Sequence, residues 1–245
     1  MTSLRKHLRV ALKDAAKKRP LVAYIGAASG DHPGFFKMIG AEIIRAGGRP
    51  VAAKLCAKGA KASTARGVLE DSDVVFVSGG DVLAGMSVLS DRDMIPLFHA
   101  LAEVGRPMIG ISAGSLMLAR EWVHFPEGEA APHLGAHAVL FPCLGLAPVY
   151  VDAHAEADGW DELRVLLALL AARGDAHPVG YGLTRKGALR VDPTDGGVTL
   201  TALGTATPRY VVQRKRVVEG APLPLGAEER VRLSKPAARR SRSKG

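Results

Sequence analysis

The chain has 245 residues, of which 47% are hydrophobic and 23% are charged, and its formal net charge is +9. This length and apolar content suffice for one sizeable α/β domain or two small ones, and the 2 cysteines exclude a framework of several disulfides. The longest strongly apolar stretch, residues 165–172, is too short to span a bilayer. We therefore expect a cytoplasmic protein with no membrane segment.

The basic charge lies at the two ends of the chain. Residues 1–20 carry a net charge of +6 and residues 214–245 one of +7, whereas the residues between them carry −4. Residues 1–20 place leucines on one helical face and predict a basic amphipathic helix. Residues 220–245 are rich in Pro, Ala, Arg and Ser and predict a disordered tail. We expect these ends to be solvated, and contact with nucleic acid through them is the less favoured alternative. The rest of the chain predicts no such contact, because the chain has no zinc-ligand, RNP or helix-turn-helix signature.

Residues 21–219, which we expect to form one α/β domain, begin with alternating strand and helix patterns. The predicted strands here are 21–26, 50–55, 74–77 and 107–111, and the predicted helices are 35–46, 63–70, 82–89, 94–104 and 115–121. This alternation predicts a mostly parallel central sheet covered on both faces, which is a three-layer α/β sandwich.

The second half of the domain has a different pattern. Residues 122–148 are rich in proline and glycine and predict a loop. A strand at 149–152 and an apolar helix at 161–172 follow this loop. The remaining short strands, which predict a C-terminal β-meander, are 179–183, 188–191, 198–203 and 209–218.

The segment Gly110-Ile111-Ser112-Ala113-Gly114 stands between the fourth predicted strand and a helix. Strand, Gly-x-Ser-x-Gly and helix is the pattern of a nucleophile elbow, which exposes the serine hydroxyl on a strained turn. The start of the helix offers free N–H groups to an oxyanion. The alternative is a simple turn in which Ser112 or Ser115 caps the helix.

Two further segments fall at the carboxyl ends of predicted strands, where the sites of parallel sheets gather. Gly79, Gly80 and Asp81 follow the third strand, and Asp81 is placed to cap the next helix. Asp152 ends the predicted strand 149–152, and His154 follows it. If the strand alternation continues, both side chains lie on one face. The alternative for His154 is a hydrogen-bonded structural histidine.

The order and spacing of these three segments resemble peptidase family S51, the dipeptidase E and cyanophycinase group, over about residues 21–203. The resemblance implies a fold like that of class I glutamine amidotransferases, with serine in place of cysteine. It implies that Ser112 is the nucleophile, that His154 is its base, and that N–H groups at Gly80 and Ala113, beside Gly79, form the oxyanion hole. The implied activity is a serine peptidase for small peptides, with no cofactor or metal and with the choice between monomer and homodimer open.

The chain departs from the family pattern at the third catalytic residue. The family's Gly-[Ile/Leu]-x-Glu segment reads Gly-Leu-Thr-Arg here, so Arg185 stands in place of the glutamate. A guanidinium cannot accept a hydrogen bond from an imidazole N–H. Either Asp152, which we include among the catalytic residues, or Glu156 or Asp158 replaces the glutamate, or serine and histidine act as a dyad, or the domain is a non-catalytic binding or regulatory module. Val82 stands where cyanophycinases carry glutamine, which argues against cyanophycin as the substrate.

Overall fold

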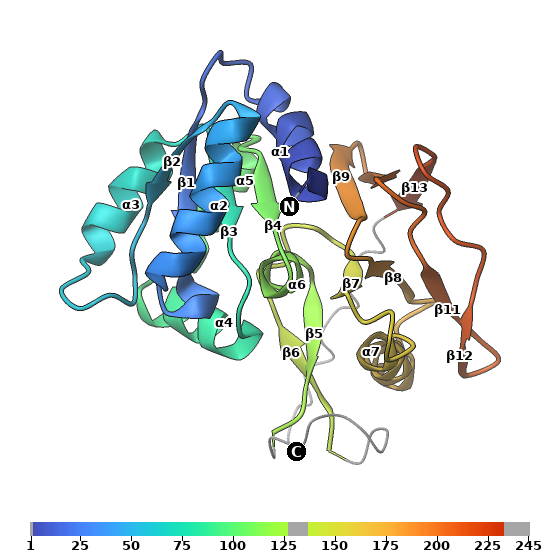
Figure 1. Cartoon of the computed structure of the whole chain (residues 1–245). Coiled ribbons are helices and arrows are strands. Elements are labelled where there is room, and N and C mark those ends of the chain that lie inside the picture. Colours follow the sequence, from blue (N-terminus) through green and yellow to red (C-terminus); the bar gives the residue numbers. More distant parts are fainter. Residues whose placement is uncertain (1, 127–136, 233–245) are drawn as a thin grey trace.

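The structure is a computed structural model that describes residues 2–126 and 137–232. Figure 1 shows its arrangement. The helices are α1 (Thr2–Asp14), α2 (Pro33–Ala46), α3 (Ala62–Asp71), α4 (Val82–Asp91), α5 (Ile95–Glu103), α6 (Ala113–Leu118) and α7 (Asp161–Arg173), with a short 3₁₀ turn, η1 (Ala27–Ser29). The strands of the first half are β1 (Leu21–Ile25), β2 (Arg49–Ala52), β3 (Val74–Val77), β4 (Met108–Gly110), β5 (Glu121–His124) and β6 (Val139–Pro142). Those of the second half are β7 (Tyr150–Ala153), β8 (Val179–Leu183), β9 (Ala188–Thr194), β10 (Gly197–Leu203), β11 (Arg209–Gln213), β12 (Arg216–Glu219) and β13 (Glu228–Arg232).

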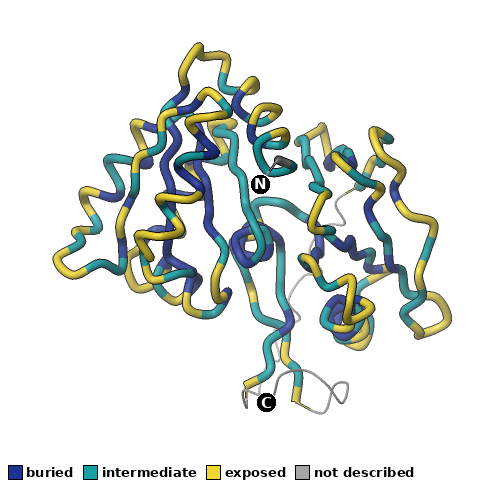
Figure 2. The backbone as a smooth tube through the Cα atoms, viewed as in Figure 1, coloured by how far each residue is buried: buried dark blue, intermediate teal, exposed yellow. Residues whose placement is uncertain are grey.

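The first half is a parallel sheet with the strand order β2-β1-β3-β4. Alternate residues of its inner strands enter two different cores: Val22 and Phe76 pack with α1 and α2, whereas Ala23 and Val77 pack with α3, α4, α5 and α6. In Figure 2 these strands run as a buried band between helices whose outer faces are exposed. The sheet is therefore the middle layer of three, and the predicted α/β fold class is confirmed.

The second half is built around two further sheets, one of four strands and one of three. One has the order β12-β11-β8-β7, in which β7 and β8 are parallel and the other pairs are antiparallel. The other has the order β13-β10-β9 and is antiparallel. Apolar residues of β8 and β10 meet between the two sheets, and α7 covers a separate cluster with Tyr150 and Tyr210. The parallel pair β7 and β8 carries His154 at its end.

Strands β5 and β6 correct the prediction of a loop over residues 122–148. They pair antiparallel, from Glu121 opposite Pro142 to His124 opposite Val139. The aromatic side chains of Trp122 and Phe141 pack edge to face with ring centroids 6.2 Å apart, which stabilises so short a hairpin. The part of the loop prediction on residues 127–136 lies outside the described residues.

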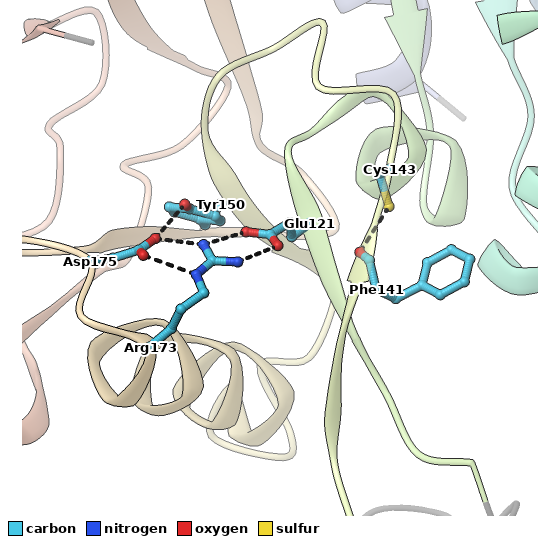
Figure 3. A network of polar contacts seen from close by, with 6 residues as sticks. All are labelled: Glu121, Phe141, Cys143, Tyr150, Arg173 and Asp175. Carbon is cyan, nitrogen blue, oxygen red and sulfur yellow. Dashed lines mark hydrogen bonds and ion pairs between the residues drawn. The ribbon is translucent and has the colours of Figure 1, made fainter. Parts of the chain in front are cut away.

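An ion-pair network holds this hairpin against the second half of the molecule (Figure 3). The guanidinium of Arg173, at the end of α7, donates to both carboxylate oxygens of Glu121 on β5 at 2.6 and 2.8 Å. The same group donates to Asp175 at 2.9 and 2.6 Å, and the Tyr150 hydroxyl donates to Asp175 at 3.3 Å. Fork-shaped pairing of this kind fixes direction as well as distance. The network therefore ties β5, β7 and α7 together.

The C-terminal part departs from expectation in two places. The predicted strand 209–218 is a hairpin of β11 and β12, with Arg214 and Lys215 at the turn, both at positive φ. The expected disordered tail is wrong for residues 220–232. Leu223 exchanges backbone hydrogen bonds with Thr207 at 2.8 and 2.9 Å, β13 pairs with β10, and Glu229 forms an ion pair with Arg209 at 3.3 Å. The rest of that prediction, residues 233–245, lies outside the described residues. No helix in the described ranges combines the length and the apolar character needed to cross a membrane.

Candidate active site

Ser112 occupies a strained turn between β4 and α6. Its backbone has φ 53° and ψ −126°, a region that non-glycine residues rarely enter. The chain crosses itself tightly here: a Cβ on Gly110 would lie 2.5 Å from the Gly114 carbonyl oxygen, and a Cβ on Gly114 would lie 2.2 Å from the Val77 carbonyl oxygen. Both glycines are thus required, and the local geometry is that of the predicted nucleophile elbow.

The structure brings Ser112 and His154 together. The Ser112 Oγ atom lies 2.8 Å from Nε2 of His154, and the Ser112 side chain makes no capping hydrogen bond to α6. His154 follows β7 at φ 48°, and its backbone N–H donates to the Leu183 carbonyl of β8 at 2.7 Å. The imidazole is exposed at this position. The distance is within the range that a proton transfer between hydroxyl and imidazole requires.

The loop after β3 lies directly against the serine. A Cβ on Gly79 would be 3.0 Å from the Ser112 Cβ atom, and one on Gly80, which has φ 143°, would be 1.9 Å from the Ala28 carbonyl oxygen. The N–H groups of Asp81 and Gly114 donate to carbonyls at 2.8 and 2.9 Å. Within the described residues, the N–H groups of Gly80 and Ala113 have no backbone acceptor.

Two aspartates, one in the loop after β1 and one in the loop after β3, have structural roles. The carboxylate of Asp81 accepts from the Ala84 N–H at 2.7 Å, which confirms the predicted helix cap. The carboxylate of Asp31, which sequence reasoning missed, accepts backbone N–H groups of Leu55 at 2.7 Å and Ala57 at 3.0 Å. A polar residue within a small-residue loop after the first strand was the available signal. Asp31 thereby joins the loops that follow β1 and β2.

Asp152 is buried, unlike the exposed His154 two residues later. Its Oδ1 accepts from the Ala153 N–H at 2.7 Å, and its Oδ2 has no hydrogen-bond partner within the described residues. Burial raises the pKa of Asp152 to about 7, and the charges of Glu162 and Asp158 add to the rise. Because β7 ends at Ala153, strand alternation does not extend to His154. The role of Asp152 in catalysis stays a prediction.

Glu156 lies beside the position where the family pattern has its glutamate. Its Oε1 accepts from the backbone N–H of Arg185 at 2.8 Å. Burial opposes ionisation of Glu156, but this hydrogen bond and the positive charges of Arg185 and His154 outweigh burial and lower its pKa. Glu156 is therefore an ionised carboxylate in the neighbourhood of His154.

Neither cysteine has the environment of an activated nucleophile. Burial raises the pKa of Cys143 to about 12 and also raises that of Cys56. A thiol attacks as its thiolate, so these shifts work against reaction. No cluster of three histidine, cysteine or carboxylate side chains within residues 2–126 and 137–232 is arranged to hold a metal ion.

The fold and the site define a three-layer α/β protein that carries a serine on a nucleophile elbow next to a histidine. The chain belongs to peptidase family S51, whose family model matches residues 1–198. This match confirms the resemblance found in the sequence. Family membership supports a hydrolase of the peptidase class.

Two solved structures share the fold. A peptidase from an acI-B1 Actinobacterium is 19% identical with a TM-score of 0.63, and the match covers 94% of this chain and 91% of that one. A putative peptidase E protein from Listeria monocytogenes EGD-e is 13% identical with a TM-score of 0.52, and the match covers 93% of this chain and 95% of that one. The comparison with curated proteins gives no match.

Proposed function

We propose that this chain is a serine-type peptidase that cleaves small peptides through an acyl-enzyme on Ser112. The observation that carries the proposal is the 2.8 Å contact between Ser112 Oγ and His154 Nε2. A serine hydroxyl is a weak nucleophile until an adjacent base removes its proton. The strained elbow supports the proposal further, because non-glycine strain of this kind gathers at functional sites.

The reaction follows from the positions of the groups. His154 Nε2 takes the proton of the Ser112 hydroxyl as Oγ attacks the carbonyl carbon of the peptide bond. The N–H groups of Gly80 and Ala113 donate to the resulting oxyanion, and one such donor lowers a barrier by about 3 kcal/mol. His154 then gives its proton to the leaving amine. Water, deprotonated by His154, hydrolyses the acyl-enzyme and frees Ser112.

Small peptides are the substrate class that the relatives favour. The two structural neighbours carry the descriptions "peptidase" and "putative peptidase E protein", and the sequence resembles the dipeptidase E group at the serine motif. The site is also reached by solvent, since His154 is exposed. A panel of dipeptides and aminoacyl-p-nitroanilides is therefore the first choice of substrates.

The test is the variant Ser112→Ala. We expect loss of turnover by about 10³-fold or more, since removal of a nucleophile leaves only binding and oxyanion stabilisation. We also expect loss of labelling by a fluorophosphonate probe. Ser115→Ala is the matched control and should label like the wild type. Equal labelling of the wild type and the Ser112 variant would remove Ser112 from the mechanism.

A non-catalytic binding or regulatory module is the second candidate. Arg185 favours it, because an arginine at the position of the family's acid cannot orient the imidazole. This candidate predicts that the purified protein turns over none of the peptides and labels with no fluorophosphonate. Turnover of any peptide that depends on Ser112 would refute it.

A further inference from the structure

The loops that leave β7 and β8 run side by side past His154. Ala153 is paired with Leu183 at the ends of these parallel strands. One residue later the His154 N–H donates to the Leu183 carbonyl at 2.7 Å. Two residues later still, the Glu156 carboxylate accepts the Arg185 N–H at 2.8 Å. The carboxylate of one loop is thus fixed to the backbone of the other.

We propose that Glu156 takes the place of the missing family glutamate as the positioning residue for the His154 imidazole. The inference rests on the proposed function and names a residue of that same site. In the family pattern the acid belongs to the segment after β8, at position 185. In this chain a carboxylate from the segment after β7 is held at the backbone of that same position. The acid of this chain thus comes from the loop after β7, whereas the acid of the family pattern comes from the loop after β8.

Within the described residues, no hydrogen bond fixes either of the other two candidate carboxylates to the segment after β8. Asp152 is buried, and one of its oxygens is engaged by the Ala153 N–H. Burial raises the pKa values of Asp152 and Glu162, and the charge of Asp158 adds to both rises. The positive charge of His154, in contrast, acts on Glu156. Glu156 is therefore the ionised carboxylate that accompanies the imidazole.

The role assigned to Glu156 is to accept the N–H of the imidazole nitrogen farther from Ser112. This bond selects the tautomer whose Nε2 is free to take the serine proton. It also stabilises the imidazolium that forms during attack. Catalytic hydrogen bonds of this kind often tighten only in the complex with substrate. Arg185 contributes its backbone N–H, which holds the Glu156 carboxylate, while its side chain is exposed.

The test measures kcat and KM for an aminoacyl-p-nitroanilide with the variant Glu156→Gln. We expect kcat to fall about 10- to 100-fold with KM within about twofold, less than the loss for a buried triad acid because Glu156 is exposed. The matched control is Asp158→Asn, an exposed carboxyl group two residues farther along, which should leave both constants unchanged. Thermal midpoints should agree for all variants.

A rescue experiment separates positioning from a structural role. Arg185→Glu, added to Glu156→Gln, returns a carboxylate to the family position and should restore most of the lost kcat. A kcat of wild-type size in Glu156→Gln would overturn the proposal, and so would a loss that Arg185→Glu leaves unrepaired. If the wild type itself neither turns over nor labels at Ser112, the proposed function fails, and this inference fails with it.

Discussion

The buried carboxyl group of Asp152 makes stability depend on pH. Its pKa of about 7 in the folded protein, a result of burial, is far above the value of about 4 for an unfolded chain. Between those values the folded state holds a proton that the unfolded state has released, so the free energy of unfolding falls as pH rises. The contribution is fully present below pH of about 4 and is lost by pH of about 7.

The variant Asp152→Asn should remove this dependence, since the amide keeps an acceptor for the Ala153 N–H and carries no charge. We expect it to exceed the wild type in stability at pH 8 by about 2 to 4 kcal/mol and to match it more closely at pH 5. Urea unfolding at the two pH values measures the difference. Asp195→Asn, at an exposed position in the turn between β9 and β10, is the control. A stability difference of the same size at both pH values would contradict the burial argument.

The chemistry of single residues explains how much of the site the sequence could predict. The roles of Ser112 and His154 could be predicted, because glycines flank the serine and the histidine follows the end of a strand. The contact between Glu156 and the Arg185 N–H was not, because it depends on the parallel register of β7 and β8. Residues 29 positions apart become neighbours only through that pairing. The sequence therefore left three candidate carboxylates and led us to include Asp152, not Glu156, among the catalytic residues.

At the scale of elements, α1 is bound to the molecule by an apolar face and by polar contacts of its first turn. Leu8 is fully buried against α2 and the sheet. Arg5 pairs with the buried Glu42 at 2.9 Å, and the Ser3 hydroxyl donates to the Lys186 carbonyl, next to Arg185, at 2.8 Å. The helix thus spans the two halves of the molecule near the turn that holds Glu156.

The variant Leu8→Ala should destabilise the protein by about 3 kcal/mol, because it leaves a cavity between α1 and α2. Val10→Ala lies on the same helix at 37% exposure, and its cost should stay below about 1 kcal/mol. Denaturant unfolding of both variants provides the measurement. Similar midpoints for the two would show that α1 is not packed as described.

Strand β13 and the turn between β11 and β12 were not predicted, because neither has a local sequence pattern that indicates it. The central strands of the parallel sheet are continuous apolar runs and are readily predicted. Strand β13 reads Glu-Glu-Arg-Val-Arg and has no such run, since it lies at an edge and exposes alternate residues. The turn between β11 and β12 uses Arg214 and Lys215 at positive φ in place of the usual Asn-Gly. Nothing local in the sequence indicates either feature.

For the molecule as a whole, the match to the family model ends at residue 198. β13, the last strand of the described residues, lies beyond this match and completes a sheet with β10. β13 pairs along its full length with β10, from Gly197 to Thr201 of that strand. Its Glu229 pairs with Arg209 of the neighbouring sheet at 3.3 Å. The Tyr181 hydroxyl is buried in the same region, where burial and the nearby charge of Glu229 raise its pKa. Removal of β13 would therefore unpair one sheet and expose polar groups of the other.

Two truncations test whether this closure stabilises the entire fold. A chain that ends at residue 226 lacks β13 but keeps the hydrogen bond from the Gly226 N–H to the Ala202 carbonyl. A chain that ends at residue 232 keeps every contact described above. We expect the shorter chain to lose about 2 kcal/mol or more, a fall in the thermal midpoint of at least about 4 °C, and the longer chain to melt like the full protein. If both chains melt alike, β13 contributes nothing to global stability, and the second half of the fold is held by its apolar clusters and the ion pairs of Arg173.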